Sequence, residues 1–178
     1  SGKMISVGVF TKKFTDPIEL RMDGGSNGDR WLFSYTNAAS ATLVGAEVEI
    51  RKGMDFVSDK LKDFTFIGNV TVLQSTVKLN STQASGKETT QNRPLFGQSP
   101  YLINAGFQYT NTEKGFNASI LYNRQGPRLS LVGDPEGAGF YDIYERSRNL
   151  LDVQVSKKVM NNAGEFKITV SDIFNNQF

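Results

Sequence analysis

Two glutamates two residues apart, Glu47 and Glu49, form the acidic pair whose spacing could serve acid and base chemistry. Alternate residues of a β-strand face the same side, so both carboxylates would project together. Arg51 follows at the same spacing, and basic side chains on adjacent strands would be further partners. Ion pairing on a polar surface is therefore favoured over catalysis for this pair.

The residues on which most enzymes and metal sites depend are missing, because the chain has no cysteine and no histidine. This removes disulfides, thiol nucleophiles, imidazole bases and the usual zinc, copper and haem ligands. The run from Asp23 to Asp29 has the composition of a calcium loop, but it lacks the EF-hand spacing and closing glutamate, so a turn is favoured. We therefore expect no catalytic residue, metal or cofactor, and no enzymatic activity.

A second polar cluster comprises Tyr144, Glu145, Arg146 and Arg148, just before a predicted strand. These side chains could contact a ligand or order a loop. The role in ordering a loop is favoured.

The segments that must position these side chains alternate between apolar and polar residues, and helical periodicity is hard to find. About eight strands are predicted, at residues 5–9, 31–35, 44–50, 65–72, 102–109, 116–123, 151–156 and 166–171. Short turns from Thr110 to Gly115 and from Lys157 to Gly164 alternate with long connections from Ser75 to Ser99 and from Gln125 to Ser147. The prediction is an all-β, antiparallel up-and-down meander. Outer-membrane barrels have short turns on the periplasmic side and longer loops outside, so in such a barrel the short turns would be periplasmic and the long connections extracellular.

The two faces of these strands differ in residue type. One face is aromatic and β-branched, with Tyr101, Tyr109, Phe116 and Tyr122 near strand ends, and the other carries mainly small or uncharged polar residues. A soluble β-sandwich or small barrel also alternates, and it stays open as an alternative that binds a ligand. A polar interior-facing surface favours the wet lumen of a membrane barrel instead. The candidates for lining the lumen or contacting a ligand are Glu47, Glu49, Asn69, Asn104, Gln108, Asn123, Arg124, Tyr144, Glu145 and Arg146.

Length and composition limit the number of domains and the kinds of partner that can be expected. A chain of 178 residues is long enough for one domain or part of one. Its net charge of +2 comes from 20 basic and 18 acidic residues spread along the sequence, without a block that would grip a phosphate backbone. Nucleic acid is therefore not an expected partner.

Several stretches, in order along the chain, resemble the barrels of TonB-dependent receptors of the Bacteroidetes type. They are Asn37-Ala38 with Gly45-Ala46-Glu47-Val48-Glu49-Ile50-Arg51; Arg93-Pro94-Leu95 with Gly97-Gln98-Ser99-Pro100-Tyr101-Leu102-Ile103-Asn104; Leu121-Tyr122-Asn123-Arg124-Gln125-Gly126-Pro127-Arg128; Tyr144-Glu145-Arg146 with Leu151-Asp152-Val153; and Ser171-Asp172-Ile173-Phe174-Asn175. The resemblance spans nearly the whole chain.

The resemblance implies that residues 1–178 are a single partial domain, the late strands of a 22-stranded outer-membrane barrel, with the plug, the N-terminal parts and the final strand absent. Such a remnant could close on itself, remain an open curved sheet or pair its edges with a neighbour. The implied function is uptake of a scarce nutrient, such as an iron chelate, a vitamin or a glycan, into a Gram-negative bacterium. The implied partners are outer-membrane lipid, the TonB energy-transducing complex reached through the missing N-terminal parts, a surface lipoprotein, and a small-molecule or glycan cargo.

Overall fold

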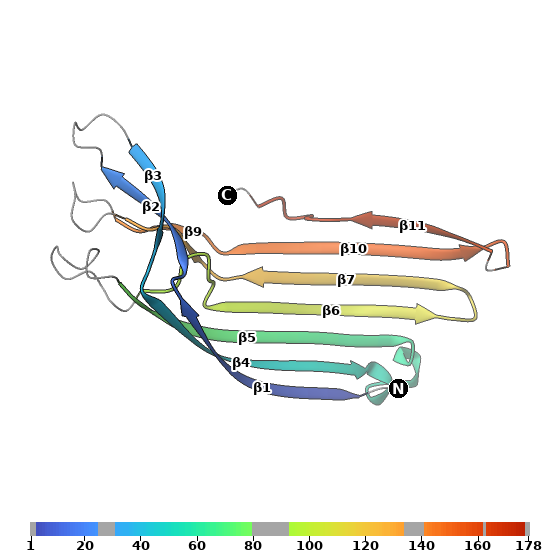
Figure 1. Ribbon diagram of the computed structural model, residues 1–178. Coiled ribbons are helices and arrows are strands. Elements are labelled where there is room, and N and C mark those ends of the chain that lie inside the picture. Colours follow the sequence, from blue (N-terminus) through green and yellow to red (C-terminus); the bar gives the residue numbers. More distant parts are fainter. Residues whose placement is uncertain (1–2, 25–30, 80–92, 134–140, 162, 177–178) are drawn as a thin grey trace.

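The protein is described from a computed structural model that covers residues 3–24, 31–79, 93–133, 141–161 and 163–176. Within these ranges the chain is almost entirely β-structure (Figure 1). Seven strands form one antiparallel sheet: β1 (Met4–Thr15), β4 (Ser40–Gly53), β5 (Phe64–Lys78), β6 (Tyr101–Asn111), β7 (Phe116–Gln125), β10 (Arg148–Val159) and β11 (Gly164–Val170). Their spatial order is β1-β4-β5-β6-β7-β10-β11, so the predicted all-β antiparallel meander is confirmed.

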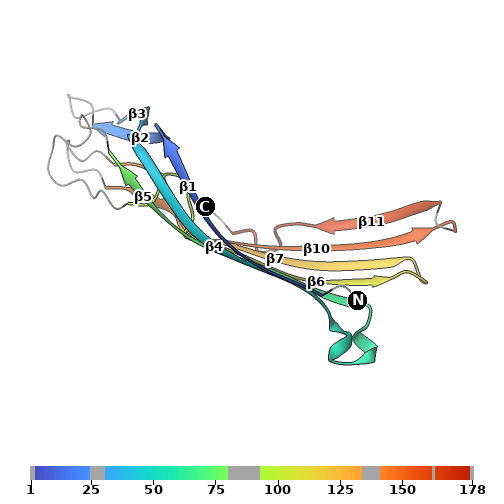
Figure 2. The same ribbon diagram turned by 60° about the horizontal axis from the view of Figure 1, so that its bottom comes forward.

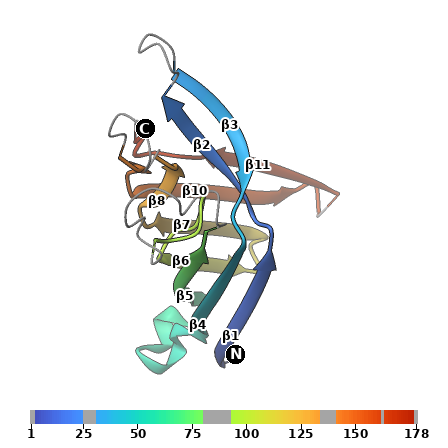
Figure 3. The same ribbon diagram turned by 60° about the vertical axis from the view of Figure 1, so that its left-hand side comes forward.

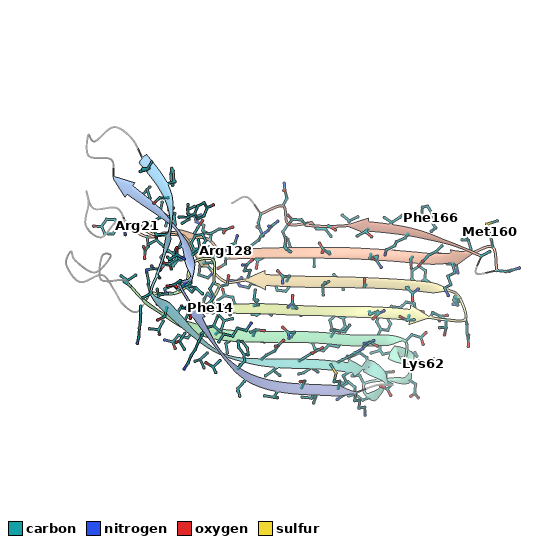
Figure 4. The ribbon with its side chains drawn as sticks, in the orientation of Figure 1. Phe14, Arg21, Lys62, Arg128, Met160 and Phe166 are labelled. Carbon is teal, nitrogen blue, oxygen red and sulfur yellow. The ribbon has the colours of Figure 1, made fainter. Side chains whose placement is uncertain are left out.

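Two further hairpins lie at the end of the sheet that carries the long connections. They are β2 (Ile18–Gly24) with β3 (Trp31–Asn37), and β8 (Arg128–Leu131) with β9 (Ile143–Glu145). The opposite end carries the short turns and two 3-10 helices, η1 (Met54–Phe56) and η2 (Asp59–Leu61). Figure 3 shows the β2–β3 hairpin projecting beyond the sheet, and Figure 4 places Phe14, Arg21 and Arg128 at the hairpin end, away from Lys62, Met160 and Phe166.

The sequence-based prediction was incomplete in its strand list. The predicted strand at 31–35 belongs to the β2–β3 hairpin and not to the meander, and β2, β8 and β9 were not predicted. The four residues of β8 and three of β9 are too few to show a period. The first long connection also begins later than predicted, because β5 continues past Ser75 to Lys78.

The register of the sheet puts most of the exposed apolar residues of the seven strands on one face. Ile5 pairs with Ile50, and Val48 pairs with Val70. A slip of one residue would turn a whole strand over, so burial or lipid contact on one face fixes the register. We call this surface the apolar face and the opposite one the polar face. Aromatic pairs gather on the apolar face near the short turns, where the ring centroids of Phe64 and Tyr109 lie 4.9 Å apart.

The strand ends are staggered across the sheet. One row of paired residues crosses five strands in the order Val48, Val70, Ile103, Arg124 and Asn149. From this row, β4 runs five residues further to Gly53 (53 − 48), β6 eight to Asn111 (111 − 103) and β10 ten to Val159 (159 − 149). Such a progressive shift tilts the strands relative to the rim, as barrel closure requires. Figure 2 shows that the sheet is curved.

The sheet is open, because β1 and β11 do not pair with each other in the part of the chain that the structure describes. The chain exposes 12248 Å² of surface, whereas a folded monomer of 19.7 kDa exposes about 8,600 Å². Few residues of the seven strands are fully buried. The described residues contain no helix long and apolar enough to cross a membrane.

A small core lies where the long connections fold over the polar face. Ala38, Ala41 and Val77 are buried, with Phe14, Leu79 and Leu95 packed against them. The backbone N–H of Leu95 donates to the hydroxyl of Ser75 at 2.7 Å, so the segment before β6 is held against β5. This core anchors the connections and leaves the middle of the sheet uncovered.

A buried ion pair joins this core to the β2–β3 hairpin. The Nη1 and Nη2 atoms of Arg93 lie 2.8 and 2.5 Å from the two carboxylate oxygens of Glu19, and the side chains are only 8% and 1% exposed. Both charges are out of water, so removing one would leave the other buried without compensation. The pair therefore fixes how the hairpin sits on the connection.

Glu19→Gln should destabilise this end of the molecule by about 3–5 kcal/mol, because Arg93 would remain buried without a counter-charge. The backbone N–H of Gly97, which donates to Leu129 O at 2.8 Å, should then exchange with solvent about two to four orders of magnitude faster in the intact protein. Hydrogen exchange measures this opening.

The half-exposed pair Arg128–Glu145 is the matched control, with side chains 40% and 23% exposed. Glu145→Gln should change stability by less than about 1 kcal/mol. The double change Glu19→Leu with Arg93→Met should recover most of the loss. Equal effects of Glu19→Gln and Glu145→Gln would contradict this account.

Candidate functional site

Amide side chains on the polar face form a hydrogen-bonded line across four strands. Asn69 donates from Nδ2 to Glu47 Oε1 at 2.5 Å, Asn104 donates to Asn69 Oδ1 at 3.5 Å, and Asn123 donates to Asn104 Oδ1 at 2.6 Å. We call these four residues the asparagine ladder. The register puts Asn69, Asn104 and Asn123 directly opposite one another, and an amide can accept from one neighbour while donating to the next. The carboxylate of Glu47 ends the line as a pure acceptor.

This arrangement gives the polar face a row of neutral donors and acceptors that ends in one carboxylate. Amide groups of this kind suit hydrogen bonding to the hydroxyl and amide groups of a solute.

The other predicted lumen-lining residues divide between the two faces. Glu49 lies on the polar face, opposite Ser6 and Asn69, and Gln108 lies there opposite Ser119. Arg124 does not, because it pairs with Ile103 and Asn149 on the apolar face. Arg124 was a candidate for lining the lumen or contacting a ligand, and the register puts it on the face opposite to Asn123. Its residue type suggested a lumen, although its spacing from Tyr122 already indicated the other face.

The structure places Tyr144, Glu145 and Arg146 away from the ladder, at the β8–β9 hairpin. Glu145 Oε2 accepts from Arg128 Nε at 2.5 Å across that hairpin. Burial, and next the charge of Asp142, raise the pKa of Tyr144 above its ordinary value, so its hydroxyl stays protonated at neutral pH. Arg146 is exposed. These contacts support the loop-ordering role for Glu145.

The segment from Arg93 to Ser99, one of those that resemble TonB-dependent receptors, mainly makes contacts that stabilise the fold. Arg93 forms the buried ion pair, and Gly97 adopts a left-handed conformation with φ of 75° while its N–H donates to Leu129 O. Ser99 donates from Oγ to the carbonyl of Gly126 at 3.0 Å. Sequence reasoning did not find the Glu19–Arg93 contact, since 74 residues separate the partners and no local period links them.

Polar contacts also hold the stretch after β11 against β10. Arg148 Nη2 lies 3.1 Å from Asp172 Oδ2, and the N–H of Asp172 donates to Asp152 Oδ1 at 2.8 Å. Asp172 has a φ of 53°, so the chain turns there and leaves the strand. The Asp172 to Asn175 stretch thus closes the edge of β10 beyond the end of β11.

No cluster of three acidic residues suited to a metal ion occurs among the residues that the structure describes. The run from Asp23 to Asp29 that was weighed as a calcium loop lies outside those residues, apart from Asp23 and Gly24 at the end of β2.

A tilted antiparallel meander with one apolar face, one polar face, short turns at one rim and long connections at the other defines the wall of a transmembrane β-barrel. Comparison with known families agrees. The chain matches the family described as "TonB dependent receptor-like, beta-barrel" over residues 1–173, which include all strands of the sheet. It belongs to the TonB-dependent receptor β-barrel family, whose members are outer-membrane receptors and transporters of Gram-negative bacteria.

One curated protein shares a shorter similarity. The small ribosomal subunit protein uS19m of Tetraselmis subcordiformis is 30% identical over 59 residues, which are 33% of this chain and 71% of that protein. This similarity covers a third of the chain, whereas the family match covers every strand of the meander. The family match therefore decides the class of the protein.

An arginine placed at Ile120, on the apolar face, should cost about 2–4 kcal/mol of folding free energy in lipid bilayers. Ile120 is midway between Phe116 and Arg124 along β7 and would face the middle of the membrane. Reversible unfolding of the complete protein from lipid vesicles measures the effect.

The matched control is Ser119→Arg, the adjacent position on the polar face, which should cost far less because a wet lumen solvates the charge. The pair Ala105→Arg and Asn104→Arg repeats the comparison on β6. Equal costs on both faces would show that the apolar face does not meet lipid.

Proposed function

We propose that this chain is part of the barrel wall of a receptor that imports a scarce nutrient across the outer membrane. The observation that carries the proposal is the pair of unlike faces on one open sheet, apolar for lipid and amide-rich for a water-filled passage. The whole chain is one partial domain of a 22-stranded barrel. A plug and other N-terminal parts outside this chain couple the barrel to the TonB energy-transducing complex.

The ladder supports a polar cargo. Glu47, Asn69, Asn104 and Asn123 form a line of hydrogen bonds along the wall of the passage. The bonds between amides give about 0.5–1.5 kcal/mol each, so a solute can exchange partners along the wall without being trapped. An iron chelate, a vitamin or a glycan all carry the oxygen atoms that such amides bind. The chain itself performs no chemistry on them.

The hairpin end supports contact with an external partner. On one face of the β2–β3 hairpin, Phe33 and Tyr35 are exposed. Exposed aromatic groups that share a face are common in interaction surfaces. A surface lipoprotein that delivers cargo to the outer rim is the partner we propose for them.

Cysteine labelling in intact cells should establish the orientation. Tyr141→Cys, at the end with the long connections, should react with a reagent that cannot cross the outer membrane, and Glu113→Cys, in the turn after β6, should not. Both positions are exposed in the structure, so accessibility of the side chain does not distinguish them. The reverse pattern would invert the orientation, and labelling of both would contradict the membrane location.

Uptake tests the transport function directly. Cells that lack the protein should grow more slowly when one nutrient, whether iron, a vitamin or a glycan, is limiting, and cells that lack TonB should show the same defect. Restoring the protein with Asn104→Leu should give only partial recovery, because the change interrupts the ladder at its centre and puts an apolar group in the passage.

Ile103→Leu is the control for this experiment, since Ile103 is the neighbouring residue on the apolar face and the change preserves volume. It should restore uptake fully. Normal growth on every limiting nutrient without the protein would refute the transport function, whereas full recovery with Asn104→Leu would refute only the role of the ladder.

A further inference from the structure

Charged residues are distributed unequally between the two faces of the sheet. The polar face carries both signs, with the acidic residues Glu47, Glu49, Asp152 and Glu165 all on it. The apolar face carries no acidic residue along the seven strands. Its charged residues are all basic: Lys13, Lys52, Lys78, Arg124 and Lys157. None of these lies in the middle of the face, so the cations border an uncharged band.

Arg124 lies at the border nearer to the long connections. It is eight residues beyond Phe116 on β7 (124 − 116), which is about 27 Å along the strand. A tilt of about 40° reduces this to about 21 Å along the membrane normal, against an apolar band about 25 Å tall. With Phe116 in the aromatic group at the opposite rim, the backbone of Arg124 lies about 4 Å inside the outer edge of the band, and its long side chain reaches the headgroup region.

Polar neighbours hold the Arg124 guanidinium in place. Its Nε donates to the hydroxyl of Tyr101 at 3.4 Å, and its Nη1 donates to Asn149 Oδ1 at 3.1 Å. The hydroxyl of Tyr122 donates to the same Asn149 oxygen at 2.8 Å. A guanidinium has five N–H donors, and among the described residues no carboxylate forms an ion pair with Arg124. The cation is therefore oriented by neutral groups and has donors left for an anion.

The surrounding backbone fits this arrangement. A Cβ atom on Gly126 would lie 2.9 Å from Cε1 of Tyr101, so glycine at this position lets the Tyr101 ring lie close against the chain. Asn176 Nδ2 donates to the carbonyl oxygen of Asn149 at 2.7 Å, and Phe174 packs edge-on against Tyr122 with ring centroids 6.5 Å apart. The stretch after β11 thus supports the site from the side.

We propose that Arg124, oriented by Tyr101 and Asn149, binds the phosphate group of a membrane-lipid headgroup on the outer surface of the barrel. The planar guanidinium matches the geometry of phosphate oxygens and keeps its charge at every relevant pH. Tyrosine side chains favour this depth, with the ring among acyl chains and the hydroxyl among headgroups. Ile103 and Leu151 flank the site on the same face and would contact the acyl chains. The inference depends on the proposed membrane orientation.

Lipid retention by the complete protein tests the site. The protein in detergent would be titrated with phosphatidylglycerol, and bound lipid counted by native mass spectrometry. Arg124→Leu should weaken the tightest binding about tenfold or more, because it removes the charge-assisted hydrogen bonds. Arg124→Lys should give an intermediate affinity, since lysine keeps the charge but lacks the planar set of donors that binds two phosphate oxygens at once. Tyr101→Phe should weaken binding by a smaller factor, because it keeps the ring and loses the orienting hydroxyl.

Arg51→Leu, on the polar face, is the matched control and should leave binding unchanged. Diacylglycerol with the same chains should bind far more weakly than phosphatidylglycerol. If Arg124→Leu does not fold, Arg124→Lys and Tyr101→Phe decide the question. Unchanged binding in the Arg124 and Tyr101 variants would overturn the site, and displacement of the lipid by millimolar inorganic phosphate would assign it to the free anion instead. If the Ile120 and Ser119 comparison shows lipid contact while these variants bind normally, only this inference fails and the proposed function stands.

Discussion

The cross-strand register of the seven-stranded sheet is the constraint on which the other features depend. Each backbone hydrogen-bond ladder fixes which residues lie opposite one another, and a period of two then fixes the face of every side chain. The pairs Val70 with Ile103 and Asn69 with Asn104 follow from one and the same register of β5 against β6. A continuous apolar surface and a line of amides are therefore two results of a single alignment.

This architecture separates stability from function in space. Most of the buried side chains lie at the end with the long connections, where Glu19 and Arg93 hold the β2–β3 hairpin against the core. The middle of the sheet has no core of its own, so its strands depend on backbone pairing and on whatever medium covers the apolar face. In hydrocarbon every backbone group must be paired within the protein. An open sheet with the free edges of β1 and β11 satisfies that rule only when other strands pair with those edges.

Polar residues near the strand ends have distinct roles according to the face on which they lie. On the polar face, the ladder leaves groups that can exchange partners with a solute. On the apolar face, Arg124 is fixed by Tyr101 and Asn149 at the depth where hydrocarbon gives way to headgroups. Polar side chains of the same kind thus line the passage on one face and meet the lipid boundary on the other. Successive residues of a strand face opposite sides, so the position of a residue along its strand determines which of the two roles it has.

The sequence alone determined the all-β class, the strands of the meander and the face of nearly every strand residue. The alternation of apolar and polar residues can be seen within each segment, without knowing which strands are its neighbours. It also contained the correct face for Arg124, which residue type obscured. Only the tertiary structure decided which residues meet. Asn69, Asn104 and Asn123 form one line because strand pairing brings them opposite one another, and Glu19 reaches Arg93 because two connections fold onto the same patch. These are distances between remote parts of the chain, and no period within a strand encodes them.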